Sequence, residues 1–199
     1  MFPHAVAAPS TLTTGLANMN ATLHVVNMVG NIGRLEATGN RYRFYAEGYT
    51  PSLITLLEKL DAERVAVAAA FGTKVPGIHT WLLETYRLGG DTLRETFHRL
   101  THEPTGPYQW TPTPPSLQHK YVIEDVPCGL VAMSSLGRAA GVATPVIDGL
   151  IALTSAMLGR DFRAEGRNLE HLGLRGQSVD GIRALVEGRD LLDSVTSMR

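Results

Sequence analysis

The first third of the chain contains a long segment without charge. Residues 5 to 33 include no Asp, Glu, Lys or Arg, which fits either a membrane span or a helix buried inside a globular domain. Polar side chains inside the segment decide between them, because placing asparagines and a histidine in hydrocarbon would cost more than the apolar residues return. They are Asn18, Asn20, His24, Asn27 and Asn31. We predict one long buried helix over residues 11–36, ending near Gly39, and no membrane span.

Helix start and stop signals recur along the rest of the chain. Thr50-Pro51 and Thr144-Pro145 each place a capping residue before a proline, and the apolar stretches that follow end near Gly72 and Gly159. Shorter helices are expected over residues 78–87, 126–140 and from Ser178 to Val186, with Asp91 capping another that ends near residue 100. The proline-rich residues 103–116 predict an extended connection, and residues 42–45 a short hairpin arm. The prediction is an all-α domain of six to eight helices.

Composition excludes several classes of function. The 199 residues suit one domain, and 18 basic against 19 acidic residues form no basic stripe, so we expect no nucleic-acid or membrane partner. The single cysteine, Cys128, cannot form an intrachain disulfide or a cysteine-based zinc site, and no metal-binding spacing occurs. No G-x-G-x-x-G motif or βαβ alternation is present, which argues against a dinucleotide-binding fold in this chain. We expect a cytoplasmic protein with no metal ion.

Four polar residues share one face of the predicted first helix. At about 100° per residue, Asn20, His24, Asn27 and Asn31 fall within about 60° of one another. A polar stripe on a buried helix must be satisfied by something. Its partners are either the backbone of other helices or the components of a functional site, and the sequence leaves both open.

A second candidate lies a hundred residues later, in the segment 119–127. Asp125 follows Glu124 and precedes the sequence Val126-Pro127, where a helix is expected to start. At or just before the N-cap, an ionised carboxylate is favoured by free N–H groups and by the helix dipole. Asp125 is then either a plain capping residue or a carboxylate available to orient a histidine.

These segments carry a family resemblance. Residues 17–31 (ANMNATLHVVNMVGN), residues 42–52 (YRFYAEGYTPS) and the stretch Tyr121–Leu174, which contains E-D-V-P, resemble the C-terminal helical domain of the octopine/nopaline (opine) dehydrogenase family. The likeness covers roughly residues 2 to 187. The resemblance implies an all-α fold of the type found in the C-terminal domains of opine and 6-phosphogluconate-type dehydrogenases, without a Rossmann domain.

The resemblance implies an oxidoreductase that condenses an amino acid with a 2-oxo acid and reduces the product with NADH or NADPH. The family's catalytic histidine falls on His24 and its aspartate on Asp125, and Asn20 matches an asparagine near substrate or cofactor. Lys120 stands where some members have an arginine that binds the 2-oxo acid carboxylate. Asn27 and Tyr121 complete the expected substrate contacts.

The resemblance also implies a missing partner. Residues 1–10 are expected to be a remnant of the segment that links to a nucleotide-binding domain, and residues 11–199 to be the substrate-binding domain. The dinucleotide would then be bound mainly by a Rossmann-type domain, in cis or in trans. A fragment or truncated gene is favoured over a split enzyme, and a homodimer is expected. The alternative is a non-catalytic helical module for dimerisation or small-molecule binding.

Overall fold

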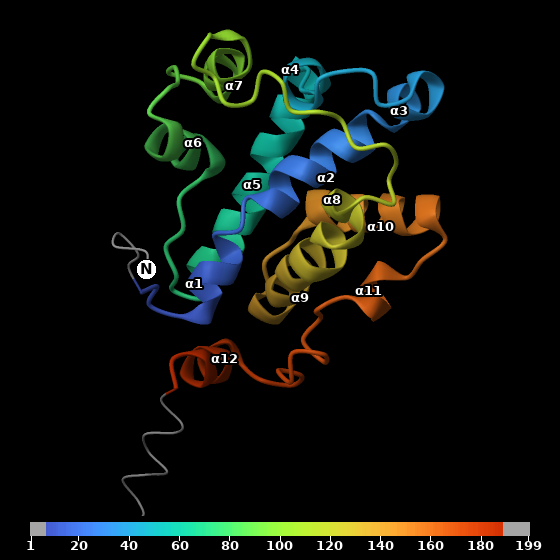
Figure 1. Ribbon diagram of the computed structural model, residues 1–199. Coiled ribbons are helices and arrows are strands. Elements are labelled where there is room, and N and C mark those ends of the chain that lie inside the picture. Colours follow the sequence, from blue (N-terminus) through green and yellow to red (C-terminus); the bar gives the residue numbers. More distant parts are fainter. Residues whose placement is uncertain (1–6, 189–199) are drawn as a thin grey trace, which may run out of the picture.

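The computed structural model describes residues 7–188, which form helices and no β-strand beyond one isolated bridge between Arg43 and Pro112. The all-α prediction is confirmed. Helices α2 and α5 cross at the centre, α8 to α11 lie on one side, and α12 lies apart at one end (Figure 1). The α-helices are α1 (Thr11–Leu16), α2 (Asn20–Gly30), α3 (Ile32–Thr38), α4 (Phe44–Gly48), α5 (Pro51–Ala70), α6 (Ile78–Tyr86), α7 (Leu93–His102), α8 (Lys120–Ile123), α9 (Val131–Ala140), α10 (Pro145–Leu158), α11 (Phe162–Glu165) and α12 (Val179–Val186), and the π-helical turn η1 (Val126–Leu130) lies between α8 and α9.

No described helix is long and apolar enough to cross a membrane. Residues 1–6 of the expected linking segment and the tail from residue 189 lie outside the described residues.

The prediction of one continuous first helix is wrong, and this break raises the helix count above the expected six to eight. The segment forms α1, α2 and α3. Between α1 and α2 the side chain of Asn18 accepts from the backbone N–H of Asn20 at 2.9 Å, a local bond that competes with the helical pattern. The break before α3 falls at Asn31, whose backbone is not helical and whose amide donates to the carbonyl of Asn27.

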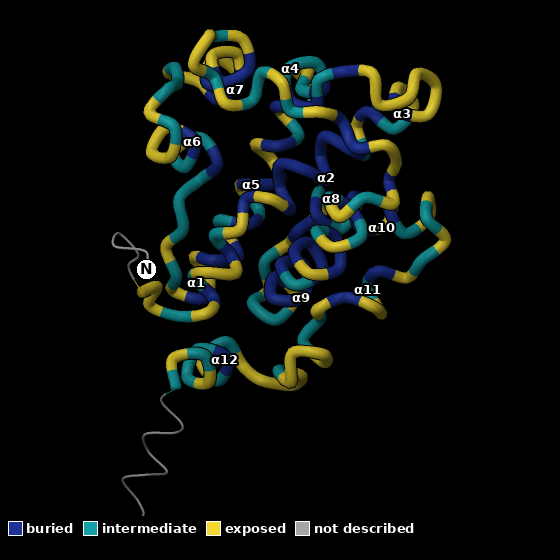
Figure 2. The backbone as a smooth tube through the Cα atoms, in the orientation of Figure 1, coloured by how far each residue is buried: buried dark blue, intermediate teal, exposed yellow. Residues whose placement is uncertain are grey.

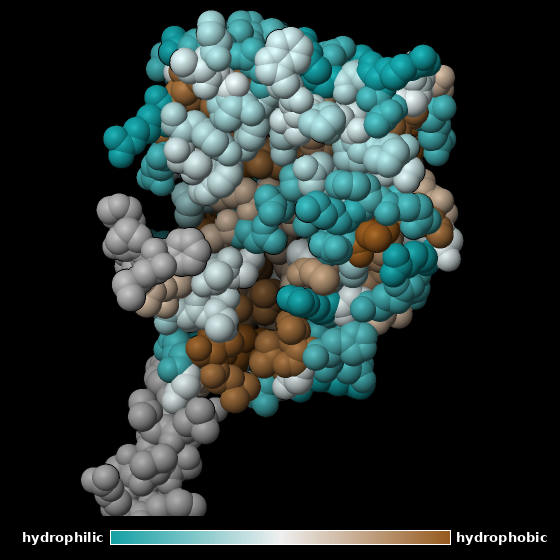
Figure 3. Space-filling view, viewed as in Figure 1, coloured by the Kyte–Doolittle hydropathy of each residue, from teal (hydrophilic) through white to brown (hydrophobic). Residues whose placement is uncertain are grey.

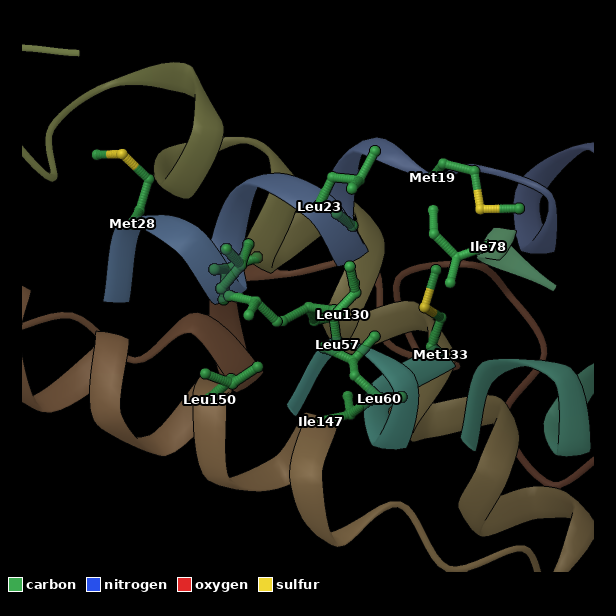
Figure 4. Packing of buried hydrophobic residues seen from close by; sticks show 14 of the residues in the cluster. Met19, Leu23, Met28, Leu57, Leu60, Ile78, Leu130, Met133, Ile147 and Leu150 are labelled. Atoms are coloured by element: carbon green, nitrogen blue, oxygen red, sulfur yellow. The ribbon is translucent and has the colours of Figure 1, made fainter. Parts of the chain in front are cut away.

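The core forms around α2 and α5. Every residue of α2 from Ala21 to Met28 is buried, which matches the expectation of a helix that is covered nearly all round (Figure 2). Leu57 and Leu60 of α5 pack with Leu130 and Ile147 of the neighbouring elements in the same cluster (Figure 4). Burying a leucine of this kind contributes about 1.5–3 kcal/mol, so this cluster fixes how α2 is presented to the segments around it.

A buried ion pair adds polar connections to the apolar core. Arg64, fully buried on α5, pairs with Asp61 at 2.7 Å and donates to the carbonyls of Leu16 and Pro76. Asp61 in turn accepts from the backbone N–H of Ile78. These bonds join α1, α5 and the start of α6, and they satisfy a charge that would be costly to bury alone.

The hairpin arm expected over residues 42–45 is also wrong, because Phe44 begins the short helix α4. The backbone of this region pairs instead with the proline-rich connection, which is extended as predicted. The N–H of Phe44 donates to the carbonyl of Thr111 at 2.8 Å, and the Thr113 hydroxyl donates to the carbonyl of Tyr42 at 2.5 Å. The connection is therefore bonded to the start of α4.

The helix expected over residues 126–140 is present as η1 followed by α9, but the capping role expected of Asp125 is wrong. Asp125 has right-handed helical backbone angles and its side chain caps nothing, because the chain turns helically from Lys120 onward. The N–H of Cys128 bonds to the carbonyl of Glu124, so the turn passes through Asp125, and Pro127 is accommodated in η1. The carboxylate of Asp125 is thus released from capping and is free to bond elsewhere.

Other expected caps had mixed outcomes. Thr50 accepts from the N–H of Leu53, and Ser178 from that of Gly181, as predicted. Thr144 forms no side-chain cap; the carboxylate of Glu63 takes the N–H groups of Val146 and Ile147 instead. Thr92 replaces Asp91 as the cap of α7, in a reciprocal pair with Glu95.

An apolar groove of about 370 Å³ lies where α1, α9 and the segment before α12 meet. It is the brown surface in the lower part of Figure 3. Leu12, Leu16, Met133, Leu136 and Leu174 are among its lining residues.

Candidate functional site

The structure brings His24 and Asp125 together from positions 101 residues apart. Imidazole Nδ1 lies 2.8 Å from Asp125 Oδ2, a direct hydrogen bond. His24 projects from the middle of α2, and Asp125 lies between α8 and η1, which both pack on α2. The two side chains are 10% and 16% exposed, so the pair is shielded from most of the solvent while an edge of each still reaches the surface.

The second nitrogen of His24 also has a partner. Nε2 lies 3.1 Å from the hydroxyl of Tyr45 on α4. An ionised carboxylate can only accept, so Nδ1 donates to Asp125 and Nε2 of the neutral ring accepts from Tyr45. Asp125, His24 and Tyr45 form a continuous hydrogen-bonded chain.

Aromatic rings hold the imidazole in place. Tyr121 stacks on it with ring centroids 3.6 Å apart and planes 15° apart, and Phe44 lies tilted at 6.2 Å. His119 packs edge-on against Tyr121, and its side chain accepts from the N–H of Tyr121 at the start of α8. The ring of His24 is therefore fixed both in its plane, by two hydrogen bonds, and across it, by stacking.

Burial shapes the ionisation of the surrounding groups. Desolvation raises the pKa of Tyr45 well above its usual value, and the nearby Tyr49, Tyr121 and Asp125 act in the same direction. The pKa of Tyr121 is raised by burial and by Asp125. The pKa of His119 is lowered, first by burial and then by the charge of Lys120. The two tyrosines beside His24 thus remain neutral hydroxyls.

Of the other residues expected at the site, some are exposed near His24 and one, Asn27, is fully buried. Asn20 is exposed at the start of α2, one turn before His24. Lys120 is the first residue of α8; it is exposed and forms no ion pair within residues 7–188. Asn27 is fully buried, and its amide donates to the carbonyl of Phe44. Asn27 and Asn31 therefore hold α4 on α2 and do not face the surface.

The sequence does not identify two residues that lie around His24, Tyr45 and His119, as site residues. Its pattern places Tyr45 in a hairpin arm, and His119 only at the start of the segment that contains Asp125. The concentration of aromatic residues in the segment YRFYAEGY was the available signal for Tyr45. Its significance depends on the packing of α4 against α2, which local pattern does not specify.

The described residues contain no group of three or more His, Cys, Asp or Glu side chains that could hold a metal ion. The arrangement suits proton transfer: a histidine shielded from bulk water, oriented by a carboxylate through one nitrogen and by a hydroxyl at the other.

Comparison with known proteins identifies the family of this helical domain. The model of the NAD/NADP octopine/nopaline dehydrogenase alpha-helical domain matches residues 7–158. An opine dehydrogenase of Arthrobacter sp. (strain 1C) is 41% identical over 187 residues, covering 94% of this chain and 50% of that protein. The protein ocs of Agrobacterium tumefaciens (strain Ach5) is 26% identical over 146 residues, covering 73% of this chain and 39% of that protein.

Solved structures resemble the fold. An octopine dehydrogenase in complex with NADH and agmatine has a TM-score of 0.71 at 22% identity, and covers 91% of this chain and 50% of that one. An octopine dehydrogenase with NADH and L-arginine has a TM-score of 0.70 at 21% identity, with the same coverage. The chain thus spans about half the length of the first relatives it matches.

Proposed function

Because this chain belongs to the NAD/NADP octopine/nopaline dehydrogenase family through its alpha-helical domain, we propose that it is the substrate-binding and catalytic half of an opine dehydrogenase-like oxidoreductase. The reaction we assign joins the amino group of an amino acid to the carbonyl carbon of a 2-oxo acid and reduces the resulting imine. The observation that carries the proposal is the His24–Asp125 hydrogen bond of 2.8 Å.

In this proposal His24 is the general acid/base. Condensation requires a proton for the departing water, and the reverse reaction requires its removal, so one group near the carbonyl carbon must hold and release a proton. Asp125 fixes the tautomer of the imidazole through Nδ1 and stabilises the imidazolium, which leaves Nε2 for proton exchange. The shielding of both side chains strengthens this interaction relative to a surface pair.

Substrate binding is assigned to the exposed residues around His24. Lys120 would attract the carboxylate of the 2-oxo acid as a point charge, without the two-pronged geometry of an arginine. Asn20 offers an amide one turn away on α2, and Tyr121 forms an apolar wall beside the imidazole.

The cofactor would be NAD or NADP, which supplies the hydride when bound. Among residues 7–188 there is no strand–helix–strand unit and no glycine-rich turn that fits a pyrophosphate. We therefore assign dinucleotide binding mainly to a Rossmann-type domain, joined in cis or associated in trans. Family membership and the paired His24–Asp125 do not favour the alternative of a non-catalytic module.

Replacing His24 tests this function. The chain would be joined to the half of the Arthrobacter opine dehydrogenase that it does not match, and NADH or NADPH oxidation measured with amino acids and 2-oxo acids. We expect His24→Ala to lower turnover by about 10²–10⁴-fold, the size of a general acid/base contribution. The control is His98→Ala, an exposed histidine on α7. Near-normal turnover in His24→Ala would remove this residue from the mechanism.

We also expect a cytoplasmic homodimer, and the exposed face of α10 fits a second copy. Gly149, Ala152, Leu153, Ala156 and Met157 are all exposed and uncharged. If two copies pack antiparallel about Leu153, Gly149 of one copy faces Met157 of the other, so the face is self-complementary, as a twofold interface requires. Leu153→Glu would then convert a dimer into a monomer in sedimentation experiments, and a wild-type chain that stays monomeric at high concentration would contradict the assignment.

A further inference from the structure

We propose that Tyr45 is a positioning residue of this site, and that its hydroxyl serves Nε2 of His24 in both protonation states of the imidazole. The inference rests on the proposed acid/base role of His24 and adds a third member to the chain that begins at Asp125. The 3.1 Å contact between Tyr45 Oη and Nε2 carries it.

A proton-transfer nitrogen needs a partner that can change its role. When the ring is neutral, Nε2 has a lone pair and requires a donor; when the ring is protonated, Nε2 carries hydrogen and requires an acceptor. A backbone carbonyl serves only the second state and a backbone N–H only the first. A hydroxyl serves both, because it donates one hydrogen, accepts through two lone pairs and rotates about its C–O bond.

The hydroxyl of Tyr45 is free to make this change. Within residues 7–188 it has no hydrogen-bond partner other than His24 Nε2. The contrast is Tyr49, four residues later, whose hydroxyl donates to the carbonyl of Leu23 at 2.6 Å and cannot reverse that bond. Two tyrosines from one segment thus both reach α2, but only Tyr45 contacts a side chain that the proposed function requires to gain and lose a proton.

The ring of Tyr45 is fixed while its hydroxyl is free. Phe44 contacts it edge-on at 4.9 Å, and Tyr108 from the proline-rich connection stacks on it at 4.3 Å. Tyr108 is itself held by a hydrogen bond of 2.8 Å to the hydroxyl of Tyr86. Burial raises the pKa of Tyr45, so the group stays a hydroxyl and never competes with Asp125 as a second negative charge. The proline-rich connection therefore contributes to the site through Tyr108, which holds the ring of Tyr45 in place.

This arrangement also constrains the substrate. Tyr121 covers one face of the imidazole, Asp125 occupies Nδ1, and Tyr45 contacts Nε2. A substrate atom that exchanges a proton with Nε2 must therefore approach beside the Tyr45 hydroxyl, within its hydrogen-bonding reach. Tyr45 would stabilise the imidazole between turnovers, when no substrate atom is present.

Nitrogen NMR of the 199-residue chain, with its histidines labelled with ¹⁵N, tests the contact without any need for activity. We expect Tyr45→Phe to move the Nε2 resonance of His24 toward that of an unbonded nitrogen, while Nδ1 keeps its proton. Tyr49→Phe is the matched control, because it removes a hydroxyl from the same segment, bonded to the carbonyl of the residue preceding His24, and should leave the Nε2 resonance unmoved. An unchanged Nε2 resonance in Tyr45→Phe, or equal changes in both variants, would overturn the proposal.

A measurement on the wild-type chain covers the case in which Tyr45→Phe does not fold. A buried, hydrogen-bonded hydroxyl proton exchanges slowly, so we expect a Tyr45 Hη resonance with a nuclear Overhauser effect to the His24 ring. Its absence from a folded chain under slow-exchange conditions would count against the contact.

Activity separates this proposal from the function on which it rests. In the joined enzyme we expect Tyr45→Phe to lower kcat by about 10- to 100-fold with little change in KM, the effect of a loosened catalytic group. Tyr49→Phe should leave both constants nearly unchanged. If His24→Ala is inactive while Tyr45→Phe keeps full kcat, the positioning role fails and the function stands. If His24→Ala is fully active, the function itself fails.

Discussion

Replacing Asp125 by asparagine changes one atom and reverses the hydrogen-bonding character of one contact. In the wild-type chain a carboxylate oxygen accepts from Nδ1 of His24 over 2.8 Å. An asparagine can turn its NH₂ group toward the same nitrogen, which then has to accept. We expect Asp125→Asn to fold normally and to shift the neutral imidazole toward the tautomer that carries its proton on Nε2.

The expected fall in kcat can be estimated from how little of the His24–Asp125 pair is exposed. A charge-assisted bond is worth about 1.5–3 kcal/mol, which corresponds to about a 10- to 150-fold effect at 1.4 kcal/mol per tenfold change. With side chains only 10% and 16% exposed, solvent screening is small and the upper end applies. The wrong tautomer adds to this loss, and in Ser-His-Asp enzymes the same substitution lowers turnover by about 10⁴-fold. We therefore expect a fall in kcat of about 10²–10⁴-fold.

Two measurements check this prediction. Turnover in the joined enzyme gives the kinetic effect, and ¹⁵N spectra of the isolated chain show which imidazole nitrogen is protonated. Glu124→Gln is the control, because it neutralises the adjacent exposed carboxylate, which makes no side-chain hydrogen bond within residues 7–188. Turnover within about threefold of wild type in Asp125→Asn, with Nδ1 still protonated, would refute the assigned role of Asp125.

Three further predictions concern binding and stability. Lys120→Arg should lower the KM for a small 2-oxo acid and Lys120→Ala should raise it; unchanged KM in both would make Lys120 a plain surface residue. Gly48→Ala should destabilise the chain by about 1–3 kcal/mol in thermal unfolding, because a Cβ would lie 2.3 Å from Oδ1 of the hydrogen-bonded Asn27, whereas Gly33→Ala meets nothing within 4 Å and should be close to neutral. Burial acts to raise the pKa of Asp148, but hydrogen bonds from Ser134 and Arg163 and the charge of Arg163 outweigh it and lower the pKa in the folded chain. Its contribution to stability is therefore present above the unfolded pKa near 3.8 and lost as pH falls through the folded value. Acid titration of Asp148→Asn should show a weaker loss of stability below about pH 4 than the wild type shows, and an equal loss in both would contradict this.

The sequence predicted the fold class and the burial of the two central helices well, because apolar spacing and capping residues are local features of the sequence. The full burial of α2 and the caps at Thr50 and Ser178 followed from those patterns. The breaks in the first helix did not, because the sequence does not show which asparagines bond to nearby backbone, as Asn18 does, or to another element, as Asn31 does. The π-helical turn at Val126 was missed for a similar reason, since a proline early in a helix is expected to start it.

The closeness of His24 and Asp125 was predicted, but not for the structural reason given. The carboxylate was expected to sit at a helix start, where a capping bond would have held it. In the structure the helical turn continues through Asp125, its side chain caps nothing, and this is what leaves Oδ2 available to the imidazole. The resemblance to a family supplied the pairing, whereas the capping argument on its own pointed to a competing use of the same carboxylate.

The sequence left open whether the polar stripe on α2 bonds to the backbone of other helices or belongs to a functional site, and we infer that it does both. Its outer members, Asn20 and His24, lie at or near the surface, where a substrate can reach them. Its inner members, Asn27 and Asn31, are buried and bond to the carbonyls of Phe44 and Gly48 at the two ends of α4. Those bonds fix the helix that carries the Tyr45 hydroxyl to Nε2 of His24. Loss of an inner asparagine would therefore leave His24 in place and displace the residue beside it, so one stripe serves both the architecture and the proposed chemistry.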